Sequence, residues 1–271
     1  PQAARALAPR EHRLRREDGR ARRACRRLRR QRRPGRILCA ARSERRDLHV
    51  PAAGDDGRLD LARQELGREG VAELARWLAT DAGAGVARLS LGSNPQIGDE
   101  AMVQLLDALK DVSLTSLDIS STGCGISTAS KLAELLSGAT KFSAAVEALA
   151  VGANPIGTEG GNILIEAIQS SNLKTIDIGK PLPLQGKYES DTADLADSGM
   201  GPGQVVILAW WLTTDAAAGV TRLTLDSNEI FGKLPDVYGD GAKPDKFAAK
   251  CDSFLAALKD SNITTLSLQN T

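Results

Sequence analysis

Residues 86–94 read V-A-R-L-S-L-G-S-N, and this short frame recurs along most of the chain. The frame is L-x-x-L-x-L-x-x-N, with Val86, Leu89 and Leu91 at the apolar positions and Asn94 at the end. Its apolar residues recur at 114, 117 and 119; at 146, 149 and 151; at 173, 176 and 178; at 220, 223 and 225; and at 263, 266 and 268. Self-similarity at a period of about 30 residues is typical of repeat architectures.

Helical patterns lie between these frames. Ala101, Leu105, Leu106 and Leu109 fall on one face of a helix, and similar patterns cover residues 132–136 and 163–168. Each repeat is therefore predicted to hold a short strand, a turn and an amphipathic helix. Neither element buries its apolar side alone, so neighbouring repeats must stack.

The closing residue of the frame has a predicted role. An Asn side chain at the turn can bond main-chain groups that the strand leaves unpaired. Asn94, Asn154 and Asn228 hold this position, Thr122 is a weaker substitute, and Pro181 replaces Asn in one repeat.

A longer period indicates duplication. Residues 76–89, R-W-L-A-T-D-A-G-A-G-V-A-R-L, match residues 210–223, W-W-L-T-T-D-A-A-A-G-V-T-R-L, at an offset of 134. L-L-D-A-L-K-D at 105–111 matches F-L-A-A-L-K-D at 254–260, at an offset of 149. An insertion of 15 residues is therefore expected between Asn228 and Phe254, and residues 185–196 are predicted to be another insertion.

From residue 57 to 271 the chain resembles the leucine-rich repeat family, in its ribonuclease-inhibitor-like branch. The repeated frame, followed by I-G-D-E-A at 97–101 and I-G-T-E-G at 156–160, carries the resemblance. It implies an α/β solenoid, a horseshoe with parallel strands on the concave side and helices outside. Because the last frame ends at Thr271 without a helix or polar cap, we expect residues 51–271 to be an array truncated at its C-terminal end.

Charge divides the chain into two parts. Residues 1–50 hold 18 arginines, no lysine and five acids, for a net charge of +13, and the remaining residues carry −12. We expect the arm, residues 1–50, to be disordered by itself because it has little to bury. Three interpretations stay open: sequence-blind binding of nucleic acid or an acidic partner, organelle targeting, or translation of a GC-rich region in a wrong frame.

The residues give little support for catalysis. Both histidines, His12 and His49, lie in the arm, so a His-activated nucleophile in the repeats is excluded. The four cysteines show no CxxC pair and are expected to be free thiols. Asp99 and Glu100 lie in the first turn of a predicted helix, where the helix dipole stabilises negative charge, and this is a sufficient reason for their presence. We therefore expect no enzymatic activity, metal or cofactor.

The expected function is protein–protein recognition, by analogy with the family. Side chains between the apolar strand positions should form an exposed face. The candidate contacts on this face are Arg88, Asp118, Asp177, Arg222 and Asp226. Tyr188, Phe231 and Tyr238, in two inserted loops, are further candidates, unless they pack on the solenoid itself.

Alternatives to a scaffold remain. Some horseshoes of the family are GTPase activators or regulatory subunits, and nucleic acid would bind only through residues 1–50. The partner is expected to be another protein in an intracellular, cytoplasmic setting, with the nucleus or an organelle also open. No apolar run reaches the 18–20 residues or so of a membrane helix.

Overall fold

The computed structural model describes residues 56–230, 248–269 and 271. All of them lie in the unit of the chain that runs from Cys39 to Thr271. A short strand, a turn and a helix alternate along the described chain. The strands of three residues are β1 (Arg58–Asp60), β2 (Arg88–Ser90), β3 (Ser116–Asp118), β4 (Ala148–Ala150), β5 (Thr175–Asp177), β6 (Pro181–Pro183), β7 (Thr192–Asp194), β8 (Arg222–Thr224) and β9 (Thr265–Ser267). The helices are α2 (Arg68–Leu78), α3 (Gly98–Leu109), α4 (Ile126–Ser137), α5 (Lys141–Ala145), α6 (Gly157–Gln169), α7 (Pro202–Leu212), the 3₁₀ turn η2 (Asp215–Ala217) and α8 (Ala248–Asp260).

The strands form two sheets, ordered β1-β2-β3-β4-β5-β6 and β7-β8-β9. β1 to β5 run parallel, and the central apolar residue of each strand is in register with the next: Leu59, Leu89, Leu117, Leu149 and Ile176. These five side chains are at most 1% exposed. The predicted frames are therefore confirmed as parallel strands whose apolar positions form the core.

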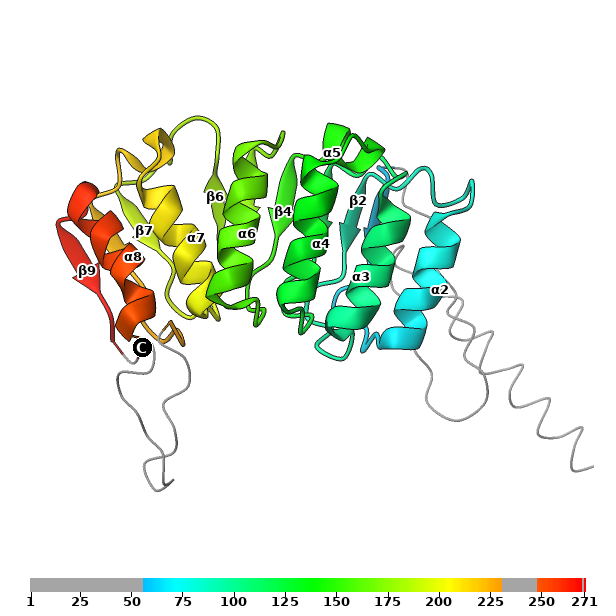
Figure 1. The fold of residues 1–271 in the computed structure, drawn as a ribbon, viewed down its shortest axis with the longest axis horizontal. Helices are drawn as coiled ribbons and strands as arrows, with labels where there is room; N and C mark the ends of the chain where they lie inside the picture. Colours follow the sequence, from blue (N-terminus) through cyan, green and yellow to red (C-terminus); the bar gives the residue numbers. More distant parts are fainter. Residues whose placement is uncertain (1–55, 231–247, 270) are drawn as a thin grey trace, which may run out of the picture. The chain divides into compact units, whose positions relative to one another are not determined.

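The helices pack against one another in chain order, α2 on α3, α3 on α4, α4 on α6, α6 on α7 and α7 on α8. Figure 1 shows them side by side in front of the strands. In α2 the buried residues are Val71, Leu74 and Leu78, spaced by three and four, as expected for a helix with one apolar face. The predicted α/β repeat is thus observed over the described residues.

Asparagine side chains connect successive repeats at the turns. Asn94 Oδ1 accepts hydrogen bonds from the N–H groups of Gln64 and Leu66, both at 3.0 Å, while Nδ2 donates to the carbonyls of Leu61 and Leu91. Asn154 and Asn228 make equivalent bonds in their repeats. Each Asn thus bonds the turn of the preceding repeat as well as its own strand.

Thr122 occupies the same position with a shorter side chain. Its hydroxyl donates to the carbonyl of Ile119 in its own strand at 2.6 Å and lies 3.0 Å from the sulfur of Cys124. Cys124 is a buried free thiol, as expected, and burial raises its pKa above the ordinary value. The other three cysteines lie outside the residues whose side chains are described.

The parallel order is interrupted after β5, where the sequence has Pro181 in place of Asn. The chain reverses there, and β6 pairs antiparallel with β5. Leu184 N–H donates to the Lys174 carbonyl, and Ile178 N–H donates to the Lys180 carbonyl. The main-chain N–H and C=O groups of the even-numbered residues in this segment therefore point toward β5. The main-chain groups of Pro181 and Pro183 therefore point to the outer edge of the sheet. Because proline has no N–H to donate, this edge does not pair with a further strand. This edge explains why a second sheet begins with β7.

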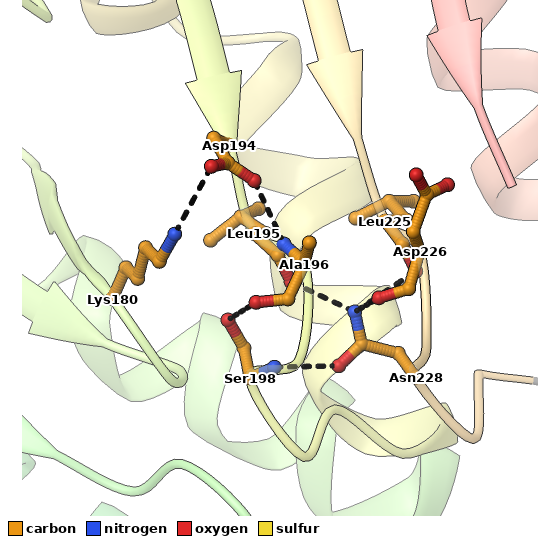
Figure 2. Close-up of polar contacts among 8 residues, drawn as sticks. All are labelled: Lys180, Asp194, Leu195, Ala196, Ser198, Leu225, Asp226 and Asn228. Atoms are coloured by element: carbon orange, nitrogen blue, oxygen red, sulfur yellow. Dashed lines mark hydrogen bonds and ion pairs between the residues drawn. The ribbon is translucent and has the colours of Figure 1, made fainter. Parts of the chain in front are cut away.

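The expected insertion at residues 185–196 is partly wrong. Residues 192–194 form β7, which pairs with β8 and corresponds to β1 at the offset of 134. The frame is hard to recognise because Ala193 replaces its central leucine, yet Ala193 and Leu195 are buried at 0% and 1% exposure. Figure 2 shows Asn228 between the two strands, bonded to Leu195, Ser198 and Leu225.

The packing of α6 against α7 connects the repeats of the first sheet to those of the second. A Cβ on Gly161 of α6 would lie 2.6 Å from the carbonyl oxygen of Gly203 in α7, so the two backbones approach more closely than other residues would permit. Gln204, fully buried in α7, donates to the carbonyl of Asn154 at 2.9 Å and accepts from Gly201 N–H. Trp211 Nε1 donates to the outward carbonyl of Pro183 at 2.7 Å. Side chains thus replace the missing strand pairing.

Candidate functional site: the exposed face of the strands

In β1 to β8 the first and third residues of each strand point away from the buried central residue, and we call the surface that the first and third residues of all the strands form the strand face. In β1, β2 and β8 the first residue is exposed, the second buried and the third exposed or half-buried. None of the described first or third strand residues is aromatic. The strand face is therefore polar, with small side chains.

Arginines begin three of the strands. Arg88 and Arg222 hold the same place in the duplicated repeats, as expected, and both are exposed. Arg222 forms an ion pair with Asp191 at 2.6 Å, which lowers the pKa of that carboxyl below its ordinary value. Within the described ranges, no carboxylate lies at ion-pair distance from Arg88. Arg88 thus keeps a guanidinium available for an external anion.

Arg58 was missed by the sequence interpretation, because the first repeat has only a weak copy of the frame. It lies in register beside Arg88 on the neighbouring strand and pairs with Asp60 at 3.3 Å. The weaker copy Leu59-Asp60-Leu61 indicated this strand, but the residue before it was not selected as a contact. The structure therefore brings Arg58 and Arg88 together and leaves Arg222 in the second sheet.

Asp118 is held at the end of β3 by two serines. Its carboxylate accepts from Ser90 Oγ at 2.8 Å, from Ser120 Oγ at 2.6 Å and from Ser120 N–H at 3.0 Å. The space beside it exists because residue 92 is glycine; a Cβ there would lie 2.9 Å from Asp118 Oδ2. The carboxylate is therefore fixed in orientation, and it stays half-buried.

Asp177 ends β5, two strands away from Asp118. Burial raises the pKa of Asp177 above its ordinary value, and the negative charge of Asp118 raises it further. A hydrogen bond from Gly179 N–H lowers the pKa, but by less. Gly179 N–H donates to Asp177 Oδ1 at 2.8 Å. The two carboxylates thus lie close enough to repel each other, and together they give this part of the strand face a negative potential.

Asp226 follows β8 in the second sheet. It accepts hydrogen bonds from Ser267 Oγ and Gln269 N–H, both at 2.7 Å, on the neighbouring strand segment. Asp194, which the sequence interpretation did not select, pairs with Lys180 at 3.6 Å and connects the segment before β6 to β7 (Figure 2). The second sheet therefore also carries oriented carboxylates.

Of the aromatic loop candidates, Tyr188 lies within the described residues. The Tyr188 ring packs edge-on against Trp211, with centroids 5.5 Å apart, and Tyr188 N–H donates to the Ala216 carbonyl. Tyr188 is half-buried against the molecule itself, in keeping with the second expectation for this loop. Phe231 and Tyr238 lie outside the described residues, and so does most of the loop after Ile230.

The remaining chemistry of the described residues is limited. Over residues 56–230 and 248–269, no group of three or more histidine, cysteine, aspartate or glutamate side chains is placed to hold a metal ion. The described helices include none with the length and apolar character needed to span a membrane.

Comparison with known proteins gives one kind of match. No family model matches the chain, and none of the curated proteins does. Among solved structures, the chain is similar to leiomodin-1 actin-binding site 2, with a TM-score of 0.34 and 11% sequence identity. The similarity covers 73% of this chain and 78% of that one.

Proposed function

We propose that this protein is a non-catalytic scaffold of the leucine-rich repeat type, ribonuclease-inhibitor-like, that binds another protein through the strand face. The observation that carries the proposal is the alternation of buried and exposed residues in successive parallel strands. It produces a continuous polar surface with a packed layer of helices behind it.

The charged groups on this surface are already oriented. Asp118 and Asp226 are each fixed by hydrogen bonds from neighbouring strands or turns. Binding then requires less loss of side-chain entropy than binding through free side chains. Arginine is among the residues that most often dominate interface energies, which favours Arg88 and Arg222 as central contacts.

The partner is proposed to be a protein and not a small molecule. Small ligands bind in concave, mostly apolar pockets, whereas the described first and third strand residues are polar or small. A protein surface with complementary charges would cover several strands at once, because neighbouring strands lie only about 4.8 Å apart. The arginine and aspartate side chains of the strand face would then fix its orientation.

The test is a nuclease-treated pull-down from native extract with residues 1–271, residues 51–271 and the double variant Arg88→Ser/Arg222→Ser. We expect the first two to capture the same protein and the double variant to lose it at least tenfold. Lys141→Ser, an exposed change on α5, is the control and should capture normally. Equal capture by the double variant, or loss on removing residues 1–50, would contradict the proposal.

A further inference from the structure

Arg88 and Arg222 hold equivalent places in the two copies of the duplicated repeats, but their surroundings differ in charge. In the second copy, Arg222 Nη2 lies 2.6 Å from a carboxylate oxygen of Asp191. At the offset of 134, Asp191 corresponds to Gly57 in the first copy. The chain thus supplies an acid to one of the two arginines and a glycine to the other.

The main chain shows that Gly57 and Asp191 occupy the same place. The Gly57 carbonyl accepts from the N–H groups of residues 87 and 88 at 2.8 and 3.1 Å, and the Asp191 carbonyl accepts from those of residues 221 and 222 at 2.8 and 3.0 Å. Gly57 has a φ of 70°, and a Cβ there would lie 2.9 Å from the Gly85 carbonyl oxygen. A larger residue is therefore strained at this position, and the first copy has no side chain where the second has its acid.

Arg88 lies inside the first sheet, between two further donors. β2 pairs with β1 on one side and with β3 on the other, so Arg58 and Ser116 are both in register with Arg88. Neighbouring strands are about 4.8 Å apart, which allows two guanidinium groups to reach one carboxylate. Arg58 pairs with Asp60 at 3.3 Å, whereas no carboxylate of the described ranges lies at ion-pair distance from Arg88. In the second copy Thr192 replaces Arg58, so the positive charge is doubled only where the acid is missing.

We propose that Arg88 and Arg58 form a binding site for a carboxylate of the partner, an aspartate or glutamate side chain that takes the place filled by Asp191 in the second copy. The inference rests on the proposed function and names the partner's chemistry at this point. A guanidinium holds a carboxylate through two parallel hydrogen bonds. A negative group between two arginines also reduces their mutual repulsion. The partner therefore carries an acid where it crosses β1 and β2.

The test follows the Nε–Hε signals of isotope-labelled arginines in the full chain by NMR, with the Arg88 signal assigned from Arg88→Gln. The probe is the tripeptide Gly-Glu-Gly with blocked ends, and Gly-Gln-Gly is its uncharged control. We expect saturable shifts of the Arg88 and Arg58 signals, with one common Kd, for the glutamate peptide alone. Arg58→Thr, which copies Thr192, should weaken binding at Arg88 by about threefold, as expected of an exposed ion pair. Arg76→Gln, on α2, removes an exposed arginine that already contacts Glu73 and should leave the Kd unchanged.

A second variant should create the same kind of site in the other copy. Asp191→Asn removes the internal acid and keeps its shape, so the Arg222 signal should then shift with Gly-Glu-Gly. In the original chain Arg222 is already paired, and its signal should not move. An unmoved Arg88 signal in the original chain would overturn the proposal, and so would equal shifts from the two tripeptides. An Arg222 signal that stays unmoved in Asp191→Asn would refute the equivalence of the two copies on which the site is assigned.

Failure of this site and failure of the proposed function are distinguishable. In the pull-down from native extract, Arg88→Glu should capture less partner than Arg88→Gln, because it places a like charge against the partner's acid. Capture through the strand face, together with an Arg88 signal that no tripeptide moves, would overturn the carboxylate site and leave the scaffold in place. A shifted Arg88 signal, together with normal capture by the strand-face double variant, would contradict the proposed function and retain the carboxylate site.

Discussion

The carboxylate of Asp99 accepts a hydrogen bond from Thr128 N–H at 2.8 Å, 29 residues further along the chain. Gly125 N–H and Ser127 N–H also donate to it, at 3.0 and 3.2 Å, and the Thr128 hydroxyl contacts it as well. Asp99 lies in the first turn of α3, yet it caps the N-terminus of α4. One repeat thus supplies the cap for the helix of the next.

Asp99→Ala should destabilise the protein by about 1–2 kcal/mol, because the N–H groups at the start of α4 lose their acceptor. The measurement is urea unfolding at pH 7. Glu166→Gln, an exposed change on α6, is the control and should have little effect. An unchanged midpoint in Asp99→Ala would show that water replaces the cap without cost.

The same carboxylate predicts a pH dependence. Burial raises the pKa of Asp99, but the hydrogen bonds from Thr128, Ser127 and Gly125 outweigh it and lower the pKa below its ordinary value. A lowered folded-state pKa stabilises the protein at pH values above the unfolded pKa of about 3.9, and this contribution is lost as the pH falls through the folded pKa. The stability difference between the original chain and Asp99→Asn should therefore be constant above about pH 5 and shrink below about pH 3.8. A difference that grows on acidification would contradict this assignment.

Asn154→Ala should cost about 2–4 kcal/mol, since several buried main-chain groups lose partners at roughly 1–3 kcal/mol each. Its side chain bonds Thr122 N–H, Cys124 N–H and the carbonyls of Ile119 and Val151. Asn162→Ala, exposed on α6, serves as the control in denaturant unfolding. Similar midpoints for the two variants would mean that the asparagine bonds contribute little.

Trp211→Phe should loosen the segment around β6. The change keeps an aromatic ring near Tyr188 but removes the donor to Pro183, at a cost of about 1–3 kcal/mol for a buried carbonyl left unpaired. Trypsin cleavage at the exposed Lys187 reports the opening of this segment and should accelerate several-fold. Trp77→Phe is the matched control, and equal cleavage rates in both variants would rule out the Pro183 bond as a clamp.

Gly161→Ala tests the close approach of α6 and α7. Alanine favours a helix interior by about 1 kcal/mol over glycine, but overpacking typically costs about 1–3 kcal/mol. Because the new Cβ would meet backbone at 2.6 Å, we expect net destabilisation. Gly85→Ala, with no heavy atom within 4 Å, should be neutral in the same thermal unfolding experiment. A stabilised Gly161→Ala would show that the helices can separate.

The sequence predicted the elements of each repeat better than their polar partners. The leucine frames identified β2, β3, β4, β5, β8 and β9, and a weaker copy at Leu59-Asp60-Leu61 identified β1, because apolar spacing directly reflects which side chains are buried. β7 was missed because Ala193 is too small to mark its frame. Pro181 indicated a change in the turn, but the antiparallel β6 depends on the space left beside β5, which local sequence does not encode.

The same limit applies to single residues. Asp99 was assigned to the dipole of its own helix, whereas its hydrogen bonds reach the next repeat. Gln204 belongs to no sequence motif, and its hydrogen bonds depend on which main-chain carbonyls lie close to α7 in the folded chain. The alternation of apolar and polar residues was enough to select the charged residues of the strand face, which are Arg88, Asp118, Asp177, Arg222 and Asp226. That Ser90, Ser120 and Ser267 orient the aspartates could be known only from the register of neighbouring strands.

The outward prolines of β6 have a consequence for how the molecule melts. In a linear array, cooperativity passes between neighbours through their shared interface. Between β6 and β7 that interface has no ladder of main-chain bonds and depends on the contact of α6 with α7, on Gln204 and on Trp211. We expect thermal melting to begin as a separation at this junction, with the β7–β9 segment opening as its own thermodynamic unit before the segment from β1 to β6.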